Sequence, residues 1–313
     1  MKKYGFGADV GGTTIKMGLF EMDGTLVEKW EIPTDTTEKG AHILQDIAAT
    51  VHGKMVENDL TKDMVEGIGI GVPGAVDKDG VVNRAVNLGW DIVPLAEELG
   101  KLSGMKVKVG NDANVAALGE NWMGSGKGYN SIVMVTLGTG IGGGIIIDGN
   151  ILTGANGAAG EIGHIVVNEQ EIEACNCGHY GCIEQYASAT GIVRMAKRAL
   201  AGTSEDSKLR TFGEAVSAKD VFDCARAGDK VACDVVDQVC GMLGATLAKL
   251  GCVVNPDAFI IGGGVSRAGQ ILIDALQEPF KAQVFHACKD TPIVLATLGN
   301  DAGIYGAVRM LLS

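Results

Sequence analysis

The chain has 313 residues, of which 46% are hydrophobic, and its formal net charge is −12. This length and apolar content suffice for two domains of ordinary size. The acidic balance argues against nucleic acid or an anionic membrane as a partner, because either would need a basic surface. We expect no signal peptide and no segment long enough to span a bilayer, so a cytoplasmic protein is predicted.

A weak internal repeat organises the chain. Residues 5–24 and 132–150 each contain an apolar strand, a Gly/Thr turn, a second apolar strand and an Asp-Gly hairpin signal. The repeat predicts two related α/β domains. We assign residues 1–118 with 298–313 to a smaller N-terminal domain, and residues 119–297 to a larger one.

Strands and helices are expected to alternate along the remainder of the chain. This alternation is typical of mixed or parallel sheets covered by helices. Apolar runs and helical spacing predict strands over 65–72, 107–110 and 258–261, and helices over 92–101, 113–121, 233–250 and 266–276.

The glycine turns are candidate phosphate sites. The first lacks the spacing of a P-loop and is followed by a strand pattern, so neither a Walker nor a Rossmann motif fits. Its backbone amides and hydroxyls, and those of the second turn, could bind phosphate oxygens, although each turn could also be only a tight hairpin. A third cluster would let a flat ligand approach the backbone closely. The predicted ATP contacts are Gly11, Gly12, Thr13, Thr14 and Lys16, then Gly138, Thr139, Gly140 and Gly142, and finally Gly262, Gly263 and Gly264.

Two carboxylates lie at predicted strand ends. Asp112 stands between a strand and a helix, where it could cap the helix or accept the proton of an attacking hydroxyl. Asn111 beside it offers a donor and an acceptor to a polyhydroxy ligand. Asp9 ends the first strand and is the candidate for holding Mg²⁺ through water, with turn stabilisation as the alternative.

A compact block at residues 161–184 predicts a zinc site. His164, Cys175, Cys177 and Cys182 have spacings that can close around one ion. Three thiolates and one imidazole make a four-coordinate structural site with no position for a catalytic water. Glu161 and Glu184 flank this block and are candidates for recognition. The other cysteines are expected to be small buried side chains in a reducing compartment: Cys224, Cys233, Cys240, Cys252 and Cys288.

Taken together, the motifs resemble the ROK family of sugar kinases and sugar-responsive repressors, and within it the bacterial glucokinases. The resemblance covers essentially the whole chain. It is carried by D-V-G-G-T-T-I-K, G-V-P-G-A-V-D, N-L-G-W, N-D-A-N, L-G-T-G-I-G-G-G, G-E-I-G-H and C-N-C-G-H-Y-G-C-I-E.

The resemblance implies an actin-like (ribonuclease H-like) two-domain fold with ATP and sugar in the interdomain cleft. It implies that Asp112 is the catalytic base and that His164 and the three cysteines hold zinc. The implied sugar contacts are Gly74, Asn87, Asn111, Asp112, Glu161, His164 and Glu184. His179, inside the cysteine block, is expected to be exposed, although it could compete as a ligand.

The family contains both enzymes and transcription factors. Repressor members carry an N-terminal helix-turn-helix domain, whereas here the first phosphate hairpin begins within the first ten residues. We therefore expect a kinase that uses ATP and Mg²⁺, with glucose ahead of N-acetylmannosamine, N-acetylglucosamine, fructose or allose. A non-catalytic sugar sensor is the alternative. The likeness also implies a homodimer or a dimer of dimers.

Overall fold

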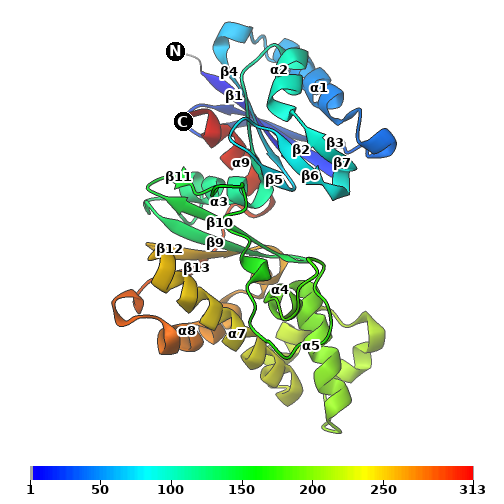
Figure 1. Ribbon diagram of the computed structural model, residues 1–313, viewed down its shortest axis with the longest axis vertical. Helices are drawn as coiled ribbons and strands as arrows, with labels where there is room; N and C mark the ends of the chain where they lie inside the picture. The colour runs from blue at the N-terminus through cyan, green and yellow to red at the C-terminus, as the bar shows by residue number, and fades with distance from the viewer. Residues whose placement is uncertain (1–2, 313) are drawn as a thin grey trace. The chain divides into compact units, whose positions relative to one another are not determined.

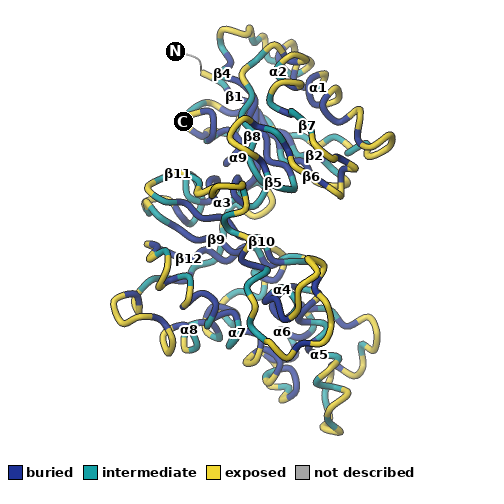
Figure 2. Tube along the Cα trace, in the orientation of Figure 1, coloured by how far each residue is buried: buried dark blue, intermediate teal, exposed yellow. Residues whose placement is uncertain are grey.

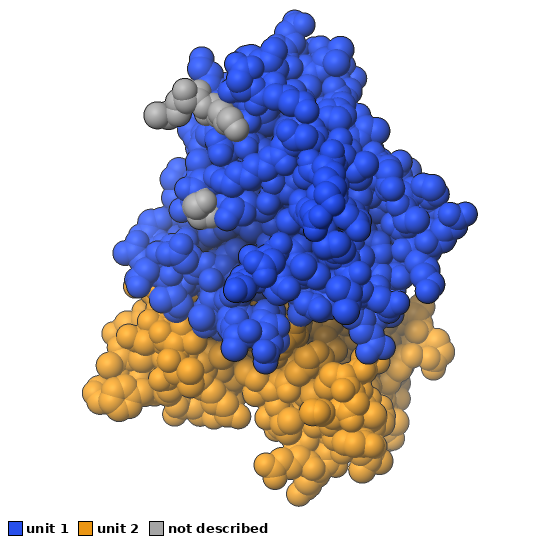
Figure 3. Space-filling model, turned by 45° about the horizontal axis from the view of Figure 1, so that its top comes forward, with its two compact units in different colours: residues 1–130, 144–160, 297–313 blue, residues 131–143, 161–296 orange. Residues whose placement is uncertain are grey.

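The computed structural model describes residues 3–312, which divide into two compact units (Figure 3). Of the described residues, unit 1 comprises 3–130, 144–160 and 297–312, and unit 2 comprises 131–143 and 161–296. The predicted mixture of strands and helices is confirmed in both units. The predicted domain boundaries stay a prediction, because compactness alone does not define a domain.

The main sheet of unit 1 has the strand order β3-β2-β1-β4-β8. Figure 1 labels its strands β1 to β4. β1 pairs antiparallel with β2 across the first glycine turn and parallel with β4, which pairs parallel with β8. The strands are β1 (Tyr4–Val10), β2 (Thr14–Glu21), β3 (Leu26–Pro33), β4 (Val65–Val72) and β8 (Val107–Asn111), and the helices of the unit are α1 (Ile43–Glu57), α2 (Leu95–Ser103), α3 (Asp112–Met123) and α9 (Ala302–Arg309).

Helices cover this sheet by two different means. On α1, the buried residues Ile43, Ile47 and Val51 recur every four residues and pack into the core of the unit. Figure 2 colours the chain by burial. α9 instead lies against bare backbone. A Cβ at Gly69 of β4 would overlap the carbonyl of Ala307, and one at Gly306 would overlap the carbonyl of Val115 on α3. The close contact through glycines thus fixes α3, and with it Asp112, relative to the sheet.

A small antiparallel sheet completes unit 1 and corrects one prediction. It has the order β5-β6-β7, with strands β5 (Ala75–Val76), β6 (Val82–Ala85) and β7 (Trp90–Val93). The helix predicted over 92–101 begins only at Leu95, because Ile92 pairs with Asn83 in this sheet and Pro94 precedes the first helical residue.

The sheet of unit 2 has the order β11-β10-β9-β12-β13, and the second glycine turn joins β9 to β10. β9 pairs parallel with β12, and β12 with β13. The strands are β9 (Ile132–Leu137), β10 (Ile141–Ile147), β11 (Asn150–Ile151), β12 (Ala258–Gly262) and β13 (Ile293–Leu295), of which β10 runs into unit 1 and β11 lies within it. The helices are α4 (Glu184–Ala187), α5 (Ala189–Gly202), α6 (Ala218–Arg226), α7 (Lys230–Val254) and α8 (Gln270–Gln283).

Three further expectations need correction. The helix predicted from residue 266 begins at Gln270, because Gly269 has a positive φ of 75° and a short 3-10 turn precedes it. By length and composition α7 could cross a membrane, contrary to expectation, although 61% of its most apolar window is buried inside the structure. Cys252 is exposed and Cys233 half-buried, since they lie on faces of α7 that are not fully covered.

Candidate active site

Asp112 lies in the first turn of α3, directly after β8, as the sequence predicts. The N-cap of this helix is Asn111, whose side chain accepts hydrogen bonds from the amides of Ala113 and Asn114. The same side chain donates to the carbonyl of Gly74 at 3.1 Å, so two predicted sugar contacts lie together. Asn111 is therefore the N-cap, and the Asp112 carboxylate also accepts a hydrogen bond from the Ala113 amide at 2.8 Å.

A second carboxylate interacts with Asp112. Burial raises the pKa of Asp9 to about 6, Lys16 opposes this shift, and the charge of Asp112 adds to it. Lys16 stands opposite Asp9 in the β1–β2 register. Two carboxylates that repel each other in a largely buried place have the character of a cation site. Lys16, a predicted ATP contact, is therefore a neighbour of Asp9, the candidate Mg²⁺ residue.

The first glycine turn, residues 11–14, is mostly exposed. Its Gly11 amide donates to the Thr14 carbonyl, and Thr34 donates through its hydroxyl to the Gly11 carbonyl at 2.7 Å. A Cβ at Gly12 would lie 3.7 Å from Asn87, so this predicted sugar contact borders the turn. The amides of the turn are thus presented at the surface beside Asn87.

The second glycine turn is bound to Glu184. The Ile141 amide donates to the Glu184 carboxylate at 2.8 Å, and a Cβ at Gly140 would overlap that carboxylate. The Thr190 hydroxyl donates to the Thr139 carbonyl at 2.7 Å. A Cβ at Gly263 would overlap the backbone of Leu137, so the third glycine cluster lies directly against this turn.

The predicted zinc ligands converge. One ligand atom from each of His164, Cys175, Cys177 and Cys182 lies within 4.8 Å of all the others. The sulfurs of Cys177 and Cys182 are 3.7 Å apart, and tetrahedral bonds of Zn–S length place two sulfurs about 3.8 Å apart. Burial raises the pKa of Cys182 to about 12, so a bound cation would be needed to keep it a thiolate. The donor set therefore fits zinc.

The imidazole of His164 has two distinct sides. Its Nδ1 lies 3.8 Å from the sulfur of Cys175, and its Nε2 lies 3.9 Å from the carboxylate of Glu161. Both side chains are accessible, at 35% and 61%. If Nδ1 binds a metal, Nε2 must carry the proton and face Glu161. His179 is exposed and outside this group of ligands.

Two buried carboxylates escaped the sequence predictions. Glu120, near the end of α3, accepts hydrogen bonds from the amides of Ser125 and Leu298 at 3.0 and 2.7 Å. Glu171 lies in the loop between His164 and Cys175, within an acidic run that is typical of a solvated surface. The available signal was a pair of arginines four residues apart, Arg194 and Arg198, which the structure places on α5.

Comparison with known proteins gives a consistent result. A family model described as the ROK family matches residues 5–313. The chain is 44% identical to a glucokinase from Halalkalibacterium halodurans, over 96% of this chain and 92% of that one, and 39% identical to a glucokinase from Thermotoga maritima, over 97% and 96%. The structure superposes on a ROK family glucokinase from Streptomyces griseus, in complex with glucose and AMPPNP, with a TM-score of 0.77, 36% identity and 98% of both chains covered. The predicted actin-like two-domain fold class is confirmed by this match.

Proposed function

Because the chain belongs to the ROK family, we propose that it transfers the γ-phosphoryl group of ATP to the 6-hydroxyl of D-glucose. The observation that carries the proposal is similarity to two glucokinases along nearly the whole chain. The reaction is ATP plus glucose giving ADP, glucose 6-phosphate and a proton.

Asp112 is the general base of the proposed reaction. It accepts the proton of the sugar hydroxyl as the oxygen attacks the γ-phosphorus, and the bond from the γ-phosphorus to the bridging oxygen of ADP breaks. Its place in the first turn of α3 supports this role, because Asn111 caps the helix and the Ala113 amide donates to a single oxygen of the Asp112 carboxylate. Asn111, Gly74 and Asn87 contribute to the sugar site.

The two glycine turns and the residues 262–264 bind the nucleotide. Backbone amides stabilise the negative charge that spreads over the transferred phosphoryl oxygens. Mg²⁺ bound with ATP would neutralise part of that charge, and Asp9 would hold it through water. The interaction of Asp9 with Asp112 supports this assignment.

Glu161, His164 and Glu184 bind the other sugar hydroxyls. Zinc, when bound by His164 and the three cysteines, is structural, because four protein ligands leave no position for substrate. His164 then donates from Nε2 to a hydroxyl, beside the acceptor Glu161. We further propose a cytoplasmic homodimer or dimer of dimers, which rests on family resemblance alone.

A coupled ADP-release assay over a panel of hexoses tests the proposed function. With ATP and Mg²⁺ present, we expect glucose to give the largest kcat/KM. A larger value for N-acetylmannosamine, N-acetylglucosamine, fructose or allose would reassign the substrate. Sugar binding by calorimetry without turnover on any member of the panel would instead favour a sensor.

A further inference from the structure

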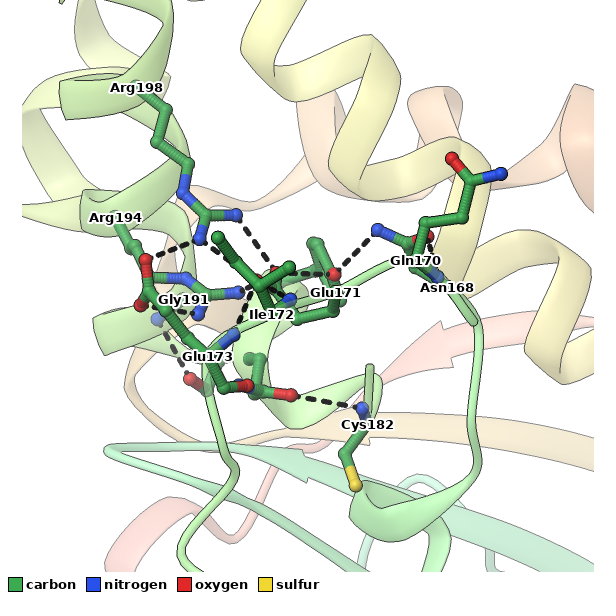
Figure 4. Close-up of polar contacts among 12 residues, drawn as sticks. Asn168, Gln170, Glu171, Ile172, Glu173, Cys182, Gly191, Arg194 and Arg198 are labelled. Carbon is green, nitrogen blue, oxygen red and sulfur yellow. Dashed lines mark hydrogen bonds and ion pairs between the residues drawn. The ribbon is translucent and has the colours of Figure 1, made fainter. Parts of the chain in front are cut away.

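The segment from His164 to Cys182 carries the four candidate zinc ligands and is called the zinc loop here. One buried carboxylate of this loop plays no part in the proposed chemistry. The side chain of Glu171 is only 2% exposed. Arg198 contacts its two oxygens at 2.9 and 3.0 Å, Arg194 donates to it at 3.0 Å, and the Tyr186 hydroxyl donates at 2.6 Å (Figure 4). Four hydrogen bonds from two helices thus converge on one side chain of the loop.

The partners of Glu171 make this contact strong. Arg194 and Arg198 stand four residues apart on α5, and both also contact Glu173. Hydrogen bonds from Arg198 hold the pKa of Glu171 well below its usual range, so the carboxylate stays charged at neutral pH. Removing the charge would weaken these contacts at a carboxyl group that is 2% exposed, while Arg194 and Arg198, at 22% and 38% exposed, would keep Glu173 as a partner.

The helices that hold Glu171 also hold other parts of the candidate site. Tyr186 belongs to α4, which begins at Glu184. At the start of α5, the Ala189 amide donates to the Gly138 carbonyl at 2.8 Å, and the Thr190 hydroxyl donates to the Thr139 carbonyl. The loop, Glu184 and the second glycine turn therefore share one support within unit 2.

We propose that Glu171 is a positioning residue for sugar recognition, which fixes the zinc loop on α4 and α5 so that His164 and Glu161 keep their orientation relative to Glu184. This role rests on the proposed function as a hexose kinase. It adds a second attachment of the loop that is separate from the metal. The second glycine turn contacts α5 through Ala189 and Thr190 rather than through the arginines, so a change at Glu171 should affect it less than it affects the loop.

Steady-state kinetics of Glu171→Gln test the role. The substitution keeps the size of the side chain but removes its charge. We expect the KM for glucose to rise about tenfold, while the KM for ATP changes less than twofold. Glu169→Gln is the matched control, because it makes the same change at an exposed position of the same loop and should leave both values unchanged. A merely structural role would lower the melting temperature and the active fraction without separating the two KM values.

Hydrogen exchange supplies a readout that needs neither activity nor metal content. The Val167 amide donates to the Gly181 carbonyl at 2.8 Å, which joins the two sides of the loop. In Glu171→Gln this amide should exchange at least tenfold faster, while amides of β9 keep their wild-type rates. Unchanged exchange at Val167, or equal rises in both KM values, would overturn the positioning role. Inactivity of the wild-type protein on all hexoses, with faster exchange in the variant, would overturn only the proposed function.

Discussion

The two glycine turns have the same sequence pattern but different supports. Thr34, which follows β3, holds the first turn through its hydroxyl and its amide, at the carbonyls of Gly11 and Thr13. α4 and α5 hold the second turn through the Glu184 carboxylate, the Ala189 amide and the Thr190 hydroxyl. An internal repeat in sequence therefore does not imply a repeat in environment.

The difference in support suggests that the two glycine turns have different functions. Asp9 lies two residues before the first turn and interacts with Asp112. The candidate catalytic residues are therefore associated with the first turn. The second turn contacts Glu184, a candidate sugar ligand, so it belongs with recognition. Substitutions near the first turn should then change turnover, and substitutions near the second should change binding.

The largest effect is expected at Asp112. Asp112→Asn keeps the volume but cannot take a proton, so kcat should fall about a hundredfold or more while glucose still binds. Coupled ADP-release assays measure kcat, and calorimetric titration measures glucose binding. The melting temperature should stay near that of the wild type, because Asn111 caps α3 and the amide oxygen of the new side chain can still accept from the Ala113 amide. Near-normal turnover would show that Asp112 is not the general base. It would also contradict the different functions proposed for the two turns.

Loss of the zinc ligands should affect recognition only. Cys177→Ser should lose stoichiometric metal and weaken glucose binding by at least tenfold, because His164 then loses its fixed orientation. Nucleotide affinity should change little, since both glycine turns lie outside the loop. Mass spectrometry of metal content and calorimetric titrations measure these changes. Cys252→Ser, at an exposed cysteine outside the cluster, is the control. Normal glucose binding by a zinc-free variant would separate the metal from recognition.

Alanine substitutions at Gly138 and Gly140 of the second turn should have different kinetic effects. A Cβ at Gly140 would displace Glu184, whereas a Cβ at Gly138 would meet only the Gly140 carbonyl at 3.9 Å. We therefore expect Gly140→Ala to raise the KM for both glucose and ATP several-fold. Gly138→Ala should raise the KM for ATP alone, because the added methyl leaves Glu184 in place and would crowd only the phosphate of the proposed nucleotide. Identical kinetic profiles for the two variants would show that the turn and Glu184 act independently.

The smallest effect is a pH-dependent stability at the first turn. Burial raises the folded-state pKa of Asp9 from 3.8 to about 6, so the folded protein keeps this proton at pH values where the unfolded chain has lost it. The stability that comes from this proton is fully present below about pH 4 and is lost as the pH rises to about 6. A two-unit shift corresponds to about 3 kcal/mol.

Asp9→Asn removes this charge and should raise the melting temperature in Mg²⁺-free buffer at pH 7.5 by about 5 °C. The difference should vanish near pH 4. Scanning calorimetry at both pH values gives the comparison, with Asp91→Asn as an exposed control. A lower melting temperature for Asp9→Asn at pH 7.5 would mean that the buried charge is compensated. The negative charge of Asp9 would then need no bound cation to stabilise it.

Local patterns predicted the elements and the zinc ligands well. The strand at Val65–Val72 was predicted with its observed bounds, because a buried apolar run has few alternatives. The ligands were predicted from spacing, since closely spaced cysteines with glycines between them can converge without distant contacts. The helix start near residue 92 was wrong because cross-strand pairing of Ile92 overrode its helical spacing.

Long-range contacts could not be predicted in the same way. Glu184 was predicted to bind sugar, but its contact with the Ile141 amide joins residues 43 positions apart and leaves no local pattern. The burial of Glu171 depends on arginines more than 20 residues later. The roles assigned to Asp9, Asp112 and the sugar contacts stay predictions that the experiments above address.

The packing of α9 has a consequence for synthesis of the chain. The backbone of Gly69 in β4 and the main chain of α3 at Val115 are covered by α9, which follows all of unit 2 in the sequence. A ribosome releases the chain from its N-terminus, so the part of the sheet that α9 covers stays uncovered until residues 302–309 emerge. Unit 2 can complete its core earlier, because its last strand ends at Leu295. The part of the chain that is made first therefore gains its last packing partner at the end of synthesis, and α3, which begins at Asp112, can pack on α9 only at that stage.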